Sequence, residues 1–195
     1  MSKIIVSEFV SLDGVIQAPG GPTEDTEGGF AYGGWAMGNG DDGEFVTKGI
    51  QSVGAFLLGR VTYQIFAAYW PQQTEENNKI AQSINSKPKY VVSTTLTEAD
   101  TQLHGTRLIN RDVVQALSNL HQQPGDDIMV IGSSKLVQTL THHNLVDEYR
   151  LIQYPLLLGR GKKLFREDGP KTDLRLVSSQ TTPSGLLILT YQPRK

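Results

Sequence analysis

Short apolar runs, bounded by glycine or polar turns, recur along the chain and predict buried strands. They cover residues 3–10, 55–58, 89–93 and 127–131, with a weaker run at 108–109. The run at 127–131, Asp-Ile-Met-Val-Ile, is the clearest, because it has four consecutive apolar residues and ends at a glycine. Such near-continuous apolar strands are typical of a sheet that is covered on both faces.

Apolar residues at helical spacing predict helices between these strands. The predicted helices cover residues 44–53 and 61–70, a segment opened by Asp112, and a segment that follows the turn Gly132-Ser-Ser134. Pro71 ends the second helix, because proline cannot continue it. Asp41 and Asp42 precede the first helix, at positions that N-caps prefer.

The C-terminal part of the chain predicts strands without intervening amphipathic helices. Residues 146–155 and 186–192 form two long candidate strands, which we expect to be antiparallel. Strands that alternate with helices, followed by a β-rich tail, predict a three-layer α/β/α fold with a mixed central sheet. The length of 195 residues, without repeats or a linker, predicts a single domain over residues 1–195.

Residues 17–43 form a long segment rich in Gly, Asp and Pro that also carries aromatic side chains. Phe30, Tyr32, Trp35 and Met37 are larger and more apolar than a solvated linker requires. Long loops in compact domains usually have a function or are disordered. Two interpretations stay open at this stage: the rings pack on the core, or the loop covers a ligand.

Charge and composition exclude several classes of partner and site. Lys and Arg number 18 against 20 Asp and Glu, which argues against a nucleic-acid or membrane surface. The absence of Cys excludes disulfides, thiolate metal sites and Cys nucleophiles. The N-terminus lacks the apolar region of a signal peptide, and no apolar run approaches the roughly 20 residues of a membrane helix. We therefore expect a cytoplasmic protein.

Three predicted strands end in residues that can bind an anion. Gly132-Ser-Ser-Lys135 leads from a strand into a helix, whose first N–H groups can hold a phosphate. Gly59-Arg60 and Thr62 follow a second strand, and Ser93-Thr94-Thr95 ends a third. Taken singly, these are an ordinary capped turn, a surface charge and the start of a loop. Together they favour a phosphate-bearing ligand.

Several motifs together carry a resemblance to a known family. They are Ser11-Leu-Asp-Gly14, Leu57-Leu-Gly-Arg-Val-Thr-Tyr63, Ile128-Met-Val-Ile-Gly-Ser-Ser-Lys135, Leu145-Val-Asp-Glu-Tyr-Arg150 and Pro155-Leu-Leu-Leu-Gly-Arg-Gly161. In this order and spacing the chain resembles the C-terminal reductase domain of bacterial riboflavin biosynthesis and its stand-alone, dihydrofolate-reductase-like relatives. The similarity extends over residues 3–192.

The resemblance implies a mixed sheet of about eight strands, NADPH as the hydride donor, and a homodimer. It places Arg60 and Thr62, after Gly59, at the 2′-phosphate side of NADPH, with Ser93 and Thr94 on the same ribose phosphate. Gly132, Ser133, Ser134 and Lys135 resemble the turn that binds the pyrophosphate, and Val15 and Ile16 resemble the loop that approaches the nicotinamide.

The proton donor is less well defined by the sequence. In dihydrofolate reductases it is a carboxylate on the first helix, and counting back from Gly59 places that position near residue 43 or 44. Glu44 is therefore the first candidate, with Asp42 and Asp13 as alternatives. Helix capping by Asp42 and simple solvation of Glu44 are the competing explanations. The segment lacks the Pro-Trp context of folate-reducing enzymes, so folate is not the default substrate.

These inferences define the expected function. We expect an NADPH-dependent reductase that transfers hydride to a small pyrimidine or pterin-like substrate, resembling 5-amino-6-(5-phosphoribosylamino)uracil reductase. The sequence carries no zinc-deaminase motif, so it is not the complete bifunctional riboflavin enzyme. Dihydrofolate reduction, or a noncatalytic nucleotide-binding regulator on the same fold, are the alternatives. The histidines, His104, His121, His142 and His143, have no metal-site spacing.

Overall fold

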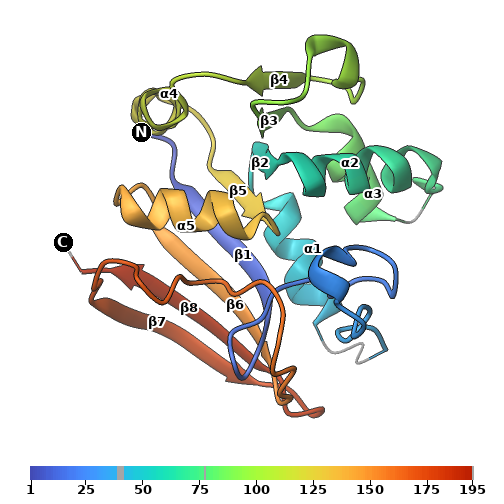
Figure 1. Cartoon of the computed structure of the whole chain (residues 1–195), viewed down its shortest axis with the longest axis vertical. Helices are drawn as coiled ribbons and strands as arrows, with labels where there is room; N and C mark the ends of the chain where they lie inside the picture. Colours follow the sequence, from blue (N-terminus) through green and yellow to red (C-terminus); the bar gives the residue numbers. More distant parts are fainter. Residues whose placement is uncertain (39–41, 77, 195) are drawn as a thin grey trace.

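A computed structural model describes residues 1–38, 42–76 and 78–194. In this part of the chain, eight strands form one sheet in the order β4-β3-β2-β5-β1-β6-β8-β7 (Figure 1). The strands are β1 (Ile4–Ser11), β2 (Ala55–Gly59), β3 (Lys89–Val92), β4 (Thr106–Ile109), β5 (Ile128–Ile131), β6 (Glu148–Tyr154), β7 (Leu174–Thr181) and β8 (Leu187–Pro193). Neighbouring strands from β4 to β6 are parallel, whereas β8 is antiparallel to both β6 and β7. The predicted mixed sheet is confirmed.

Helices cover both faces of the sheet. They are α1 (Gly43–Gln51), α2 (Arg60–Tyr69), α3 (Lys79–Ser86), α4 (Val113–Gln122) and α5 (Ser134–His142). Successive strand residues point to opposite faces. In β1, Ile4 joins the core formed with α4 and α5, whereas Ile5 joins the core formed with α1, α2 and α3. These two cores make the three layers predicted from the sequence.

Two elements of the described chain were not predicted, namely α3 and β7. The predicted strand at 146–155 forms as Glu148–Tyr154, and its antiparallel pairing with β8 is confirmed. Asp42 is the residue before α1, but its side chain makes no capping hydrogen bond. Asp41, the other predicted cap, lies outside the described residues.

The sheet register creates an opening beside the second half of β1. Ser7 pairs with Ile131, which is the last residue of β5. On its other side, β1 stays paired with β6 as far as Ser11. The segment after Ser7 therefore extends beyond β5, and its β5 side is open.

After β2 and after β5, the chain continues on opposite faces of the sheet. These neighbouring parallel strands are followed by α2 and α5, which pack on opposite faces of the sheet. Ligands of open α/β sheets bind at such a switch point, outside the carboxyl ends of the strands. The topology thus points to the same edge of the sheet as the opening beside β1.

Candidate active site at the carboxyl ends of β2 and β5

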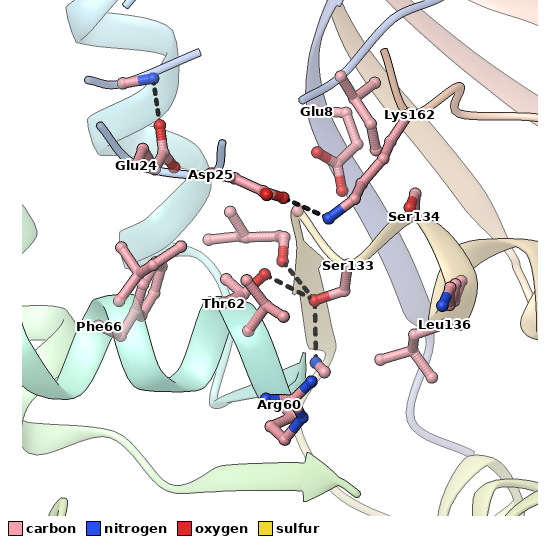
Figure 2. A pocket seen from close by; sticks show the side chains of 18 of the residues that line it. Glu8, Glu24, Asp25, Arg60, Thr62, Phe66, Ser133, Ser134, Leu136 and Lys162 are labelled. Atoms are coloured by element: carbon pink, nitrogen blue, oxygen red, sulfur yellow. Dashed lines mark hydrogen bonds and ion pairs between the residues drawn. The ribbon is translucent and has the colours of Figure 1, made fainter. Parts of the chain in front are cut away.

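A cavity of about 720 Å³ lies at this edge of the sheet. Its walls come from the ends of β2 and β5, the second half of β1, the helices α1 to α3, and the first turn of α5. Residues of the loop after β1, from Ile16 to Glu27, close one side (Figure 2). Its volume is in the range of cofactor sites, about 300–1,000 Å³.

The turn between β5 and α5 presents the start of a helix to the cavity. Gly132 and Ser133 have positive φ angles of 58° and 66°, which is the left-handed region. The Ser133 side chain does not cap α5, and Ser134 and Lys135, the first two residues of the helix, line the cavity. The positive end of the helix dipole and the Lys135 ammonium make this turn a candidate site for an anion.

The hydroxyl groups of Ser133 and Thr62 hold the two strand ends together. Ser133 Oγ donates to Thr62 Oγ1 at 3.0 Å and accepts from the amide of Gly59 at 2.9 Å (Figure 2). The sequence predicted these residues as ligand contacts. The structure shows that they also bond to each other, and so fix the spacing between α2 and α5.

The remaining predicted cofactor residues at β2 and β3 line the same cavity. Arg60 is exposed at the first position of α2, and its Nη1 donates to Gln64 Oε1 at 3.3 Å. Ser93 and Thr94 form the edge next to it, after β3. Ser93 Oγ accepts from the amide of Leu96 at 3.0 Å, so this hydroxyl stabilises its own turn. Arg60 and Thr94 stay candidates for a phosphate contact.

The sequence left two arrangements open for the loop after β1, packing on the core and covering a ligand, and different parts of the loop pack on the core and line the cavity. Ile16 lines the cavity, and Ala18 and Glu24 follow it on the same wall. Phe30 is buried against Val15 and Ala18, away from the cavity lining. Val15, predicted to approach the nicotinamide, is thus a core residue beside Ile16. The first part of the loop thus lines the cavity, and Phe30 and Trp35 pack on the core. Tyr32 and Met37 are exposed and do neither.

The helix carboxylates predicted as proton donors do not line the cavity. The Glu44 side chain is 79% exposed and pairs with Lys48 at 2.6 Å. Asp42 Oδ2 accepts a hydrogen bond of 2.6 Å from the Tyr154 hydroxyl. Burial, together with the Asp42 carboxylate, raises the pKa of Tyr154 well above its usual range, so Tyr154 stays protonated and Asp42 stays bonded to it. Neither carboxylate is therefore positioned to contact a ligand in the cavity.

Asp13 also lies outside the cavity lining and instead anchors two loops. Its carboxylate accepts from Ser11 Oγ at 2.6 Å, and from the amides of Leu158 at 3.1 Å and Gly159 at 2.8 Å. The Ser11 hydrogen bond and these amides lower the pKa of Asp13 to about 2. The predicted general acid is therefore an ionised loop anchor.

We expect Asp13→Asn to lower the free energy of unfolding by about 1–3 kcal/mol, because an amide group cannot accept all three hydrogen bonds. A lowered pKa stabilises the fold above the unfolded value, so this contribution disappears as the pH falls from about 4 to about 2. Urea unfolding of both proteins at neutral pH and at pH 3 measures the difference. An equal difference at both pH values would contradict the role of the charge.

Sequence reasoning missed the carboxyl groups that do line the cavity, above all Glu8. Glu8 lies on β1 just past Ser7, its side chain is 6% exposed, and its Oε1 has no hydrogen-bond partner among the described residues. Burial raises the pKa of Glu8 well above its usual range, against a smaller opposing effect of the Gly132 amide. The sequence signal that could have identified Glu8 is a charged residue inside a mostly apolar strand.

Three further carboxylates and a lysine form the wall opposite α2. Glu24 Oε2 accepts from the amide of Gly20 at 2.6 Å, and burial raises the pKa of Glu24. Lys162 bridges Asp25 at 2.5 Å and Glu27 at 2.7 Å (Figure 2). The cavity thus has a cationic, N–H-rich end at α2 and α5, and a carboxyl-rich side at Glu8 and the loop.

Comparison with known proteins shows the family to which this chain belongs. Residues 2–188 match the family described as the RibD C-terminal domain. The chain belongs to the RibD C-terminal domain family. Two proteins of Bacillus subtilis (strain 168) are similar to it: the uncharacterized protein YyaP, 29% identical over 97% of this chain and 94% of its own, and the uncharacterized protein YwjB, 26% identical over 89% and 88%.

Solved structures share the fold of this RibD C-terminal domain. A putative riboflavin biosynthesis protein from Shewanella sp. PV-4 has a TM-score of 0.73 at 22% identity, covering 99% of both chains. A pyrimidine reductase-like protein from Corynebacterium diphtheriae has a TM-score of 0.64 at 13% identity, covering all of this chain and 92% of that chain. Acinetobacter baumannii RibD, form 1, has a TM-score of 0.64 at 16% identity, and this chain covers 59% of it. The resemblance drawn from the sequence motifs is confirmed.

Among the described residues, no helix is both long and apolar enough to span a membrane. These residues also contain no group of three or more His, Asp or Glu side chains arranged to hold a metal ion. His121, for example, pairs with Asp147 at 2.8 Å.

Proposed function

We propose that this RibD C-terminal domain is an NADPH-dependent reductase that transfers hydride to a small heterocyclic substrate, pyrimidine or pterin-like. The observation that carries the proposal is the two-sided cavity. One end offers a helix start and basic side chains for phosphates, and the other places a buried carboxyl group, Glu8, beside the same space. A reductase needs both: a site that orients the cofactor, and a group that can supply a proton.

The residues at the first end fit NADPH. The first turn of α5 with Lys135 suits the pyrophosphate, and Arg60 with Thr94 suits the 2′-phosphate. The 2′-phosphate is the group that distinguishes NADPH from NADH. Ile16 then supplies an apolar contact for the nicotinamide, whose bound form donates the hydride. The Ser133–Thr62 hydrogen bond holds α2 and α5 in position to bind these groups.

The substrate proposal rests on the family and on the remaining lining. Related proteins carry riboflavin-biosynthesis and pyrimidine-reductase names, so a substrate like 5-amino-6-(5-phosphoribosylamino)uracil is the first choice. Dihydrofolate reduction is the weaker alternative, because Glu44 and Asp42, the candidates for the helix carboxylate of dihydrofolate reductases, both lie outside the cavity lining. A single domain, a homodimer and a cytoplasmic location stay predictions.

The test is to mix the protein with NADPH and a panel of pyrimidine and dihydropteridine acceptors, and to follow the loss of reduced nicotinamide absorbance. We expect consumption of NADPH that depends on both the protein and the acceptor, with mass spectrometry showing an acceptor that has gained two hydrogens. If NADPH binds but no acceptor is reduced, the noncatalytic regulator becomes the better description.

A further inference from the structure

Glu8 occupies a position that folding alone does not explain. Its side chain is buried within a mostly apolar strand, and its Oε1 has no hydrogen-bond partner in the described chain. A buried polar atom without a partner destabilises the fold, and such atoms are rare in native proteins. Glutamine or leucine would fill the same volume without an ionisable group. The position therefore suggests a function rather than packing.

The surroundings of Glu8 favour the protonated form of its carboxyl group. Burial removes water from the carboxylate form, and the nearby charge of Glu24 adds to the rise in its pKa. The charged groups that share the cavity come from four segments: Glu24, Asp25, Glu27 and Lys162 on the loop side, Arg60 on α2 and Lys135 on α5. Lys162 is engaged by Asp25 and Glu27, so it does not provide Glu8 with a counter-charge of its own.

The Glu8 residue lines the cavity. Glu8 and its neighbours Ser7 and Phe9 line the cavity where β1 extends beyond β5. In Figure 2 the Glu8 carboxyl group is drawn above the Lys162 amine and the Ser133–Ser134 turn, among the side chains that line the cavity. The Glu8 carboxyl group thus borders the cavity, and no group of the described chain pairs with its Oε1.

We propose that Glu8 is the catalytic acid of this site, and that its carboxyl group protonates the substrate as hydride is transferred. The inference rests on the proposed reductase function and names the group that completes it. The substrate class is a heterocycle with a reducible C=N bond, or the open-chain imine or carbonyl attached to it.

The proposed step adds a hydride and a proton to the two atoms of a C=N bond. The hydride and its electron pair pass from NADPH to the carbon of the C=N bond, which leaves NADP⁺. The π electrons of that bond form a new N–H bond with the Glu8 proton, so the product is an amine and Glu8 becomes a carboxylate. A proton from water then restores the carboxyl group before the next turnover.

The protonation state can be tested on the protein without any ligand. Glutamate labelled with ¹³C at the carboxyl carbon gives one NMR signal per residue, and Glu8→Gln identifies the Glu8 signal by its loss. We expect that signal to stay at the shift of a neutral carboxyl at pH 7, whereas Glu44, exposed on α1, is ionised. A Glu8 signal that titrates with the ordinary value of about 4.5 would overturn the proposal.

The same substitution has a predictable effect on stability, which also shows that the variant folds. Because folding raises the Glu8 pKa, the unfolded state loses its proton first, and the free energy of unfolding falls as the pH rises above about 4.5. Glu8→Gln cannot titrate, so we expect it to be more stable than the wild type at pH 8 and to gain less or nothing at pH 4. Thermal unfolding at both pH values measures this difference.

Turnover separates a catalytic role from a structural one. We expect Glu8→Gln to lower kcat by about 10²- to 10⁴-fold, with an unchanged Kd for NADPH, and Glu8→Asp to restore part of it. The wild-type kcat should fall as the pH rises through the Glu8 pKa, whereas the Glu8→Gln profile is flat. Glu44→Gln is the matched control, because it removes an exposed carboxylate, and it should retain wild-type kcat.

The outcomes distinguish this inference from the proposed function. Equal turnover of the wild type and Glu8→Gln would overturn the role of Glu8 and leave the reductase standing. Failure of the wild type to bind NADPH or to reduce any acceptor would overturn the reductase and, with it, the acid. Loss of NADPH binding in Glu8→Gln would show that Glu8 acts on the cofactor site and not on the proton.

Discussion

Gly132→Val is expected to weaken NADPH binding by at least about 100-fold. Gly132 has a φ of 58°, a conformation that a β-branched residue strongly disfavours. A Cβ there would also lie 2.8 Å from Thr62 Oγ1, so Thr62 and the start of α5 must move apart. This displaces the helix N–H groups that are proposed to bind the pyrophosphate. Calorimetric titration with NADPH, beside a circular-dichroism spectrum, measures binding and fold together.

Gly159→Val is the matched control for Gly132→Val. Gly159 has a similar φ of 72°, but a Cβ there meets no atom within 4 Å, and Gly159 is not among the residues that line the cavity. We expect a comparable backbone strain with NADPH affinity close to wild type. If Gly132→Val keeps a native spectrum and full affinity, the turn between β5 and α5 is only a connection.

Arg60→Ala is expected to weaken NADPH binding by about ten- to a hundred-fold, because it removes a charge-assisted contact worth about 1.5–3 kcal/mol. Binding of NADH, which lacks the 2′-phosphate, should change little. Arg175→Ala is the control, because Arg175 is an exposed arginine on β7, at the opposite edge of the sheet from β4. An equal loss for NADPH and NADH would place Arg60 elsewhere on the cofactor.

Strands and helices that bury one clear face could be predicted from the sequence. The run at β5 is apolar because that strand is central in the sheet, with β2 and β1 as neighbours. The strand β7 escaped prediction because it lies at the sheet edge, and seven of its eight residues are exposed. It therefore carries no apolar alternation. The helix α3 is short, and only Ile80, Ala81 and Ile84 mark its inner face.

The candidate cofactor-binding residues of the cavity could be predicted from the sequence more readily than Glu8, the proposed proton donor. Arg60 and the Gly132–Lys135 turn directly follow apolar strands, so the chain order itself predicts that they gather at one edge. Glu8 lies inside a strand, and its contact with the cavity depends on β1 extending past β5. That register comes from long-range pairing. Asp42 and Glu44 met the expected spacing, but the local helix geometry turns both away from the cavity lining.

The most direct test of the account is a calorimetric titration of the wild-type protein with NADPH and, separately, with NADH. We expect one site per chain, with NADPH bound about ten- to a hundred-fold more tightly than NADH, because the cationic end of the cavity includes Arg60. Absence of binding, or equal affinity for the two nucleotides, would contradict the assignment of this cavity to NADPH.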